Sequence, residues 1–222
     1  PALSSDPSRP ATKLGNLRIL NGQAHAVLKR LHADFNVAVA THETDSTPQI
    51  VAHTTGTYAG QPITADFIGG GLLALSDAAT PYAVDLKLQN GPTHASLVGA
   101  VQNPLNFSGV NLKLQLTGTN MELLLPLIGI AFPKTPSYQL QGDLDYTDGK
   151  IHFRDFAGKL GSSDVQGNLE ILPGRNRPVV NANVTSRQVD LADLGGFIGS
   201  EPGRLNTPNQ TPEQRQAVAR AE

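Results

Sequence analysis

Apolar and polar residues alternate strictly along several stretches of this chain. From Val110 to Leu116 every second residue is apolar, and the residues between them are polar. Successive side chains of a β-strand point to opposite faces of its sheet, so this pattern gives a strand one apolar and one polar face. The same alternation recurs at 35–39, 82–88, 140–146 and 165–171. One dry and one wet face is typical of antiparallel sheets, so the sequence predicts an all-β fold.

The composition favours short elements joined by turns over long helices. The 222 residues include 22 glycines and 16 prolines, with only 5% aromatic residues. Two apolar segments, 121–130 and 189–198, break the alternation, and each is expected to form a helical turn or a lid that closes one end of the sheet. We therefore expect an extended, curved, mostly antiparallel sheet, groove-like or sandwich-like, with one or two short helical turns. Turn dipeptides separate the alternating stretches at Asn21-Gly22, Asn90-Gly91, Asp148-Gly149 and Pro173-Gly174.

Three parts are expected along the chain. Residues 1–13 are interpreted as a flexible lead-in, residues 14–199 as one β domain, and residues 200–222 as a polar linker with a short helix. Within the β domain, a shift of 68 residues places Gly99 on Gly167 and Met121 on Val189. This shift predicts two related units, at about 82–130 and 150–199, although alternating patterns also align easily by chance.

No catalytic or metal-binding set emerges from the motifs. The chain has no cysteine, and its six histidines are scattered without a metal-ligand spacing. Asp143, Asp145 and Asp148 miss the spacing of a calcium loop, so a hairpin with carboxylates on its polar face explains them better. The segment Gly161-Ser162-Ser163-Asp164 lacks the elbow sequence of serine hydrolases, and a turn whose side chains bond local backbone is expected there. We therefore predict no cofactor, no metal and no enzymatic activity.

The charge pattern excludes one class of partner. A formal net charge of −2 with mixed signs indicates no surface for nucleic acid. The longest apolar stretch, 123–131, is interrupted by Pro126 and is too short to cross a bilayer. We interpret the chain as a fragment of a longer protein, with any membrane anchor outside it.

Several segments resemble the AsmA family. The most specific are 158–167, which contains the Gly-Ser-Ser-Asp motif, and 189–195, which reads Val-Asp-Leu-Ala-Asp-Leu-Gly. The segments 56–62, 69–71 and 116–121 are similar to the family's layout in a more diffuse way. The resemblance covers about Leu14 to Gly199, which is most of the chain.

The resemblance implies a Gram-negative envelope protein that is anchored in the inner membrane and projects into the periplasm. Relatives of the family include TamB and the chorein-type lipid-bridge proteins. The implied structure is a long, curved sheet whose hydrophobic trough holds or conducts phospholipid for outer-membrane lipid homeostasis. The implied partners are phospholipid, the membrane through the anchor, and other envelope proteins.

A sheet with one uniformly apolar face must cover that face with another sheet, a helix or a ligand. Each acyl methylene buried there contributes about 0.8 kcal/mol, so lipid can replace a protein layer. The alternative is a closed β-sandwich without lipid that docks other envelope proteins through its strand edges, and an esterase or glycosidase is a distant third. If lipid covers the face, the candidate lipid-facing residues are Leu86, Leu88, Leu112, Leu114, Leu116, Leu140, Leu144, Val165 and Leu169.

Overall fold

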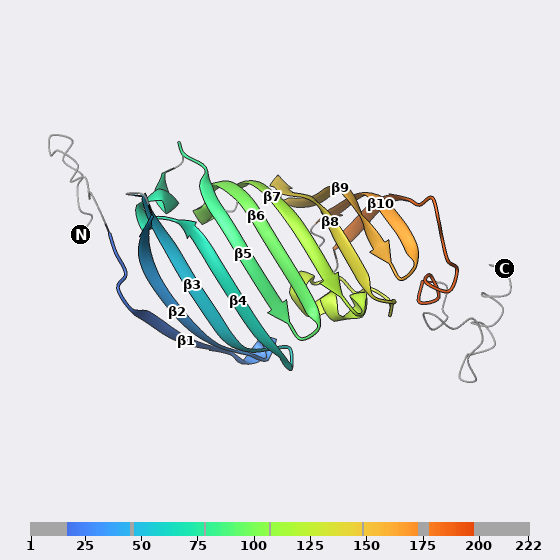
Figure 1. Ribbon diagram of the computed structural model, residues 1–222, viewed down its shortest axis with the longest axis horizontal. Helices are drawn as coiled ribbons and strands as arrows, with labels where there is room; N and C mark the ends of the chain where they lie inside the picture. Colours follow the sequence, from blue (N-terminus) through green and yellow to red (C-terminus); the bar gives the residue numbers. More distant parts are fainter. Residues whose placement is uncertain are drawn as a thin grey trace, which may run out of the picture.

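The computed structural model describes residues 17–44, 47–77, 79–106, 108–147, 149–172 and 178–197. These residues form one 11-stranded sheet, and each strand pairs antiparallel with the next one along the chain (Figure 1). This order follows from the short connections between strands, because antiparallel neighbours need only a tight turn between them. The strands are β1 Gly22–Leu28, β2 Ala33–Thr44, β3 Thr47–Tyr58, β4 Gln61–Gly70, β5 Tyr82–Asn90, β6 Thr93–Asn103, β7 Ser108–Gly118, β8 Tyr138–Thr147, β9 Lys150–Leu160, β10 Ser163–Leu172 and β11 Val179–Thr185.

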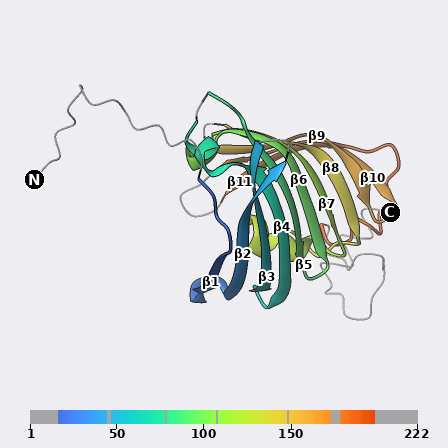
Figure 2. The ribbon, with the colours of Figure 1, turned by 60° about the vertical axis from the view of Figure 1, so that its left-hand side comes forward.

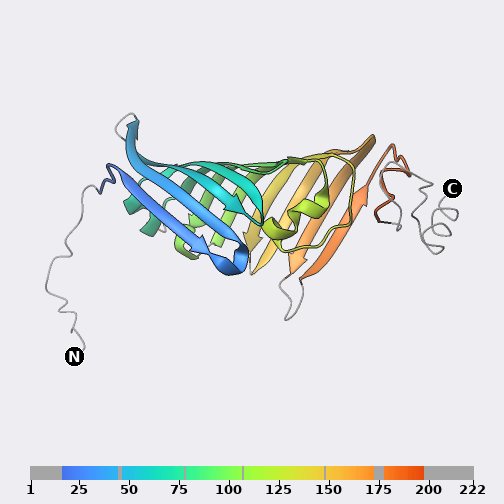
Figure 3. The ribbon, with the colours of Figure 1, turned by 90° about the horizontal axis from the view of Figure 1, so that it is seen from below.

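Helical structure is limited to short pieces in the connections between strands. One four-residue α-helix, α1, spans Leu125–Ile128 and directly follows the 3₁₀ turn η4, Met121–Leu124. The other 3₁₀ turns are η1 Lys29–Leu31, η2 Leu72–Ser76 and η3 Pro104–Asn106. The sheet is strongly curved, and η4 and α1 lie in its hollow (Figures 2 and 3).

We call the face on which η4 and α1 pack the inner face. We call the strand ends beside these two elements the lid end, and the opposite strand ends the far end. The connections β3–β4, β5–β6, β7–β8 and β9–β10 lie at the lid end, whereas β4–β5, β6–β7 and β8–β9 lie at the far end. The two ends differ in how they are covered, which matters for the site.

One bulge helps to bend the sheet between β8 and β9. The register between these strands shifts between Gln141 and Asp143, where Asp155 adopts a φ of 48°. Gly142 sits at this point, and a Cβ there would lie 2.8 Å from the ring of Phe153 and 2.8 Å from the Cα of Phe156. A glycine is therefore required, because the two rings stack over this part of the inner face at a centroid distance of 5.2 Å.

The structure confirms the predicted fold class. The sheet is antiparallel and curved, and no second sheet faces it within the ranges the structure describes, so the groove-like form holds and the sandwich-like form does not. The segment 121–130 forms the predicted helical turns. The segment 189–197 forms successive turns, with backbone bonds such as Asp193 N–H to Asp190 O at 3.0 Å.

One predicted turn is absent, and several other predictions concern residues that the structure does not describe. Asn21-Gly22 does not form a turn between two strands, because Gly22 begins β1. The hairpin at Asn90-Gly91 is present, with Asn90 paired to Thr93. Residues 1–13, Asp148, Pro173-Gly174 and the 200–222 linker lie outside the described residues.

The proposed pair of related units stays a prediction. Both 82–130 and 150–197 contain three consecutive strands followed by a turn segment. Gly99 pairs with Leu112 and Gly167 pairs with Val184, so the third strands correspond by a different shift from the one that relates the glycines.

Candidate functional site

The inner face is built from rows of side chains that run across the sheet. Residues paired directly across antiparallel strands point to the same face, so the strand register defines each row. The candidate lipid-facing residues fall in three adjacent rows of this one face. The row nearest the lid end holds Leu88, Leu116, Leu140 and Val165, the next holds Leu86 and Leu114, and the third holds Leu112, Leu144 and Leu169.

Charge is confined to the other face over the central strands. From β3 to β8, no inner position of the described strands carries a charged side chain. The outer face carries ion pairs such as Lys113 with Asp143, at 2.6 Å, and Arg154 with Asp145, at 2.7 Å. The alternation in the sequence therefore keeps charge off the inner face in this region, although apolar residues such as Ile68 and Val98 also occur on the outer face.

The inner face is only half covered by protein. Leu112 is 8% exposed, but the other candidate residues are half-buried rather than buried. Leu116, Leu140 and Val165 pack against a buried cluster of Met121, Leu124, Tyr138 and Leu160 at the lid end. The candidates of the two remaining rows lie beyond that cluster, on a face that has no opposing sheet among the described residues.

The lid, which we define as η4 and α1 (Met121–Ile128), is fixed to the sheet by hydrogen bonds as well as by packing. Asn120 Oδ1 accepts from the backbone N–H of Glu122 at 3.0 Å and of Thr135 at 3.1 Å. It therefore connects the start of η4 to the residues that precede β8. The Met121 N–H donates to Thr135 Oγ1 at 2.9 Å. The Tyr58 hydroxyl, at the end of β3, donates to Pro126 O of α1 at 2.6 Å. The lid therefore crosses the hollow of the sheet, from the start of β8 to the end of β3.

All four tyrosines of the chain lie on the inner face near strand ends. Tyr58 and Tyr138 lie at the lid end, and Tyr82 and Tyr146 lie at the far end. The Tyr82 hydroxyl donates to Gly70 O at 2.7 Å, and burial raises the pKa of Tyr82. Burial also raises the pKa of Tyr138, and the nearby Thr93 hydroxyl partly offsets that rise. The phenylalanines of the strands, Phe35, Phe67, Phe153 and Phe156, stand between these ends.

The Gly-Ser-Ser-Asp segment forms the turn between β9 and β10 and binds a segment about thirty residues further on. Asp193 accepts four bonds, from the backbone N–H and the hydroxyl of both Ser162 and Ser163, at 2.8 to 2.9 Å. Asp164 accepts from the N–H groups of Arg187 and Gln188 at 3.1 and 2.6 Å. The expectation of local backbone partners was therefore wrong, because the partners come from the 186–193 segment.

These bonds lower the pKa values of both carboxyl groups, Asp193 and Asp164. Burial alone would raise the pKa of Asp193, but the hydroxyl and N–H groups of Ser163 and Ser162 outweigh it and hold that pKa below its ordinary value. The N–H groups of Gln188 and Arg187, with the Ser186 hydroxyl, lower the pKa of Asp164. Gly161 has a φ of 60°, and a Cβ there would collide with the Asp193 carboxylate, so this turn requires glycine. The carboxylates thus stabilise the turn in their charged form.

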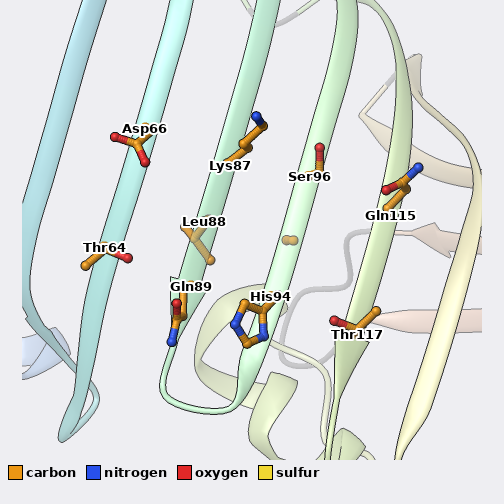
Figure 4. Close-up of a pocket in the computed structure, with 10 residues that line it drawn as sticks. Thr64, Asp66, Lys87, Leu88, Gln89, His94, Ser96, Gln115 and Thr117 are labelled. Atoms are coloured by element: carbon orange, nitrogen blue, oxygen red, sulfur yellow. The ribbon is translucent and has the colours of Figure 1, made fainter.

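The outer face offers no comparable site. An open depression on it is lined by polar side chains of β4 to β7, including Asp66, His94 and Ser96 (Figure 4). Asp66 bonds His53 at 2.6 Å and not His94, so these residues do not form a nucleophile–base–acid chain. No group of metal-ligating side chains occurs in the described part of the chain.

The sequence predicted a helical turn or lid at 121–130 and at 189–198, but not which of their side chains pack together. Leu127, Phe132 and Leu194 join the cluster at the lid end, although none belongs to an alternating stretch. Tyr58 was not singled out either, because its partner Pro126 lies 68 residues away. The Asn120 cap before η4 is a further signal for the helical turn that the sequence predicted at 121–130.

No helix among the described residues is long and apolar enough to cross a membrane. No solved structure matches the chain. The AsmA family matches residues 41–222. The chain is also 34% identical over 165 residues to the AsmA family protein YhjG of Escherichia coli (strain K12), which covers 72% of this chain and 24% of that relative. The chain thus spans about a quarter of the length of this relative. It belongs to the AsmA family, and this membership indicates a protein associated with the cell envelope.

Proposed function

We propose that this chain holds or conducts phospholipid along its inner face, as a non-catalytic module of a longer protein. In this proposal the module lies in the periplasm, and an anchor outside the chain attaches the protein to the inner membrane. One observation carries the proposal, namely an uncharged inner face from β3 to β8 that no second sheet covers in the described residues. Acyl chains have the chemistry that such a face requires.

The nature of the lining supports lipid over a rigid polar ligand. The half-buried rows consist mainly of leucine, valine, alanine and phenylalanine, which offer apolar contact without fixed hydrogen-bonding groups. Each acyl methylene that such a surface removes from water contributes about 0.8 kcal/mol. A flexible chain of many methylenes would therefore bind without requiring specific polar contacts.

The test is lipid quantification in paired variants of one strand. Leu114→Asp places a carboxylate on the inner face, whereas Gln115→Asp places one on the outer face of the same strand, β7. Mass spectrometry of lipid copurified with the purified chain should detect phospholipid in wild type and in Gln115→Asp, and a large loss in Leu114→Asp. An unpaired carboxylate in an apolar site costs several kcal/mol, which accounts for that loss.

Thermal melting of the same preparations identifies the outcome that defeats the proposal. An open face admits water beside the new carboxylate, so Leu114→Asp should lower the melting temperature less than a charge in a sealed core would. A wild-type chain that carries no lipid, together with unfolding of Leu114→Asp, would contradict the proposal.

A second candidate function is a scaffold that docks other envelope proteins through a strand edge. The edge strand β11 favours it, because all seven of its residues are exposed and none is charged. Such an edge can pair with a strand of another protein. A lipid-free wild-type chain that gains a partner, and loses it when a proline replaces Asn181 in β11, would favour the scaffold.

A further inference from the structure

We infer that the inner face takes its lipid in one orientation, with the acyl ends toward the lid end and the ester and head region at the far end, beside Tyr146. This inference rests on the proposed function. It comes from the unequal closure of the two ends and from the partners of the four tyrosines.

The lid end is closed by the protein itself. Met121, Leu124, Tyr138 and Leu160 are between 3 and 8% exposed and form one cluster over the row of Leu116 and Leu140. The bond from Tyr58 to Pro126 extends this closure across the hollow. A hydrated head group placed here would lose its water, because the two hydroxyls that lack a partner in the described part of this end, those of Thr93 and Tyr138, are themselves enclosed by the protein. An acyl end would meet mainly the apolar side chains of the cluster.

The far end is closed less firmly beside Tyr146, although Tyr82 and Val101 are buried at the far ends of β5 and β6. The turns η2 and η3 contact each other there, but neither of them buries a residue. Leu105 of η3 is 67% exposed, and Ile151, on the inner face of β9, is 37% exposed. A polar group at this end keeps its access to water.

Among the four tyrosines, Tyr146 is the one whose hydroxyl is suited to contact a ligand at the far end. Tyr58 and Tyr82 donate to backbone carbonyls, whereas the hydroxyl of Tyr138 is buried at the lid end without a hydrogen-bond partner among the described residues. Tyr146 is half-buried in the row of Val110 and Ile151, and its hydroxyl forms no hydrogen bond with any described residue. A phenol at the edge of an apolar surface suits the ester region of a lipid, as tyrosines do at membrane interfaces.

Single tryptophan substitutions can report the orientation of the lipid, because the chain contains no tryptophan of its own. Leu88→Trp places a probe in the row nearest the lid end, between Ala65 and Ala95, whose small side chains leave room. Ile151→Trp places one beside Tyr146. The two rows are six residues apart along a strand, which is roughly 20 Å. Gln141→Trp, on the outer face, is the control.

Each variant of the 222-residue chain is incubated with phosphatidylcholine vesicles containing phospholipid spin-labelled at carbon 5 or at carbon 16 of the acyl chain, and is then separated from them. Carbon 5 lies near the head group and carbon 16 near the chain end. At position 151 the carbon-5 label should quench tryptophan fluorescence about twofold more than the carbon-16 label, and at position 88 the order should reverse, because the two rows are roughly 20 Å apart along the strand direction. The control should show little quenching by either label.

The possible results separate the orientation from the proposed function. Equal or reversed quenching orders at positions 88 and 151 overturn the orientation and leave lipid binding intact. No quenching at either inner position overturns lipid binding itself. Tyr146→Phe adds a second readout, since losing one hydrogen bond to the lipid should weaken its retention about fivefold without changing the melting temperature. Unchanged retention would contradict the place given to Tyr146.

Discussion

The lid end and the far end are the two ends of the same strands, but the connections cover them differently. At the lid end, η4 follows an asparagine cap and buries Met121 and Leu124, and the adjoining α1 is tied to β3 through Tyr58. At the far end, η2 has no side-chain cap and buries no residue. The strands alone do not produce this difference, because the rows toward both ends contain apolar residues, such as Leu116 and Leu140 near the lid end and Val101 and Val110 near the far end.

The comparison shows where a single-layered sheet obtains a core. An 11-stranded sheet without a covering layer buries apolar surface mainly where its own connections fold back onto it or where its curvature brings large side chains together, as at Phe153 and Phe156. The long β7–β8 connection does so, and the 191–197 segment joins it through Leu194. The lid end therefore supplies most of the tight packing, and the remaining inner face is left for something else to cover.

The largest expected effect comes from truncating the lid. Leu124 is 3% exposed, so Leu124→Ala should lower the free energy of unfolding by about 2–5 kcal/mol. Leu105→Ala makes the same truncation at the far end, where the side chain is 67% exposed, and should change it by less than about 0.5 kcal/mol. Urea denaturation of both variants measures the difference. Equal losses would show that the two ends are packed alike.

The next largest loss of stability is expected from replacing Asp193, which holds the 186–193 segment to the β9–β10 turn at the lid end. Asp193→Ala leaves two serine hydroxyls and two N–H groups without their charged acceptor, and should cost about 2–3 kcal/mol of unfolding free energy. Asp155→Asn is the control, because Asp155 is exposed and asparagine tolerates its positive φ. A loss below about 0.5 kcal/mol in Asp193→Ala would mean that the turn does not depend on this carboxylate.

The strands could be predicted from the sequence because alternation is a local signal. A pattern such as Val110 to Leu116 specifies both the strand and its faces, and the structure places Leu112, Leu114 and Leu116 together on the inner face. The predicted hairpin at Asn90-Gly91 also depends on local chemistry. The family resemblance added what alternation does not contain, namely an open groove instead of a sandwich.

The contacts that close the lid end could not be predicted, because they join residues far apart in the sequence. Nothing in the local sequence of Tyr58 indicates Pro126, and nothing near Ser163 indicates Asp193. Such contacts arise only after the sheet has curved and brought the connections onto its inner face. The lid that covers Leu116 and Leu140 depends on this curvature, so their partial coverage was not foreseen.

A smaller effect should follow from releasing the lid without removing its core. Tyr58→Phe deletes the 2.6 Å bond to Pro126 O and should cost about 1 kcal/mol. Because the bond is made to α1, hydrogen exchange should rise at the Gly129 N–H, which bonds Leu125 O, more than in the β-strands. Unchanged exchange at Gly129 would show that the packing of Leu124 alone holds the lid.

The smallest expected effect is a pH dependence confined to the lid end. The pKa of Asp164 is lowered in the folded chain by the N–H groups of Gln188 and Arg187 and by the Ser186 hydroxyl. A carboxyl group whose folded pKa lies below its unfolded value, about 3.9, stabilises the fold above that value. The contribution is lost as the pH falls through the folded pKa, so acid should loosen the 186–188 segment below about pH 4. Asp164→Asn should remove this dependence and should loosen the 186–188 segment slightly at neutral pH as well, because the neutral amide lacks the charge that the N–H groups favour. Amide exchange of Gln188, followed by NMR between pH 6 and 3, measures it, and the far-end amide of Asp77, bonded to Ala74 O, serves as the reference. Parallel acid profiles for wild type and Asp164→Asn would show that this carboxylate does not hold the segment.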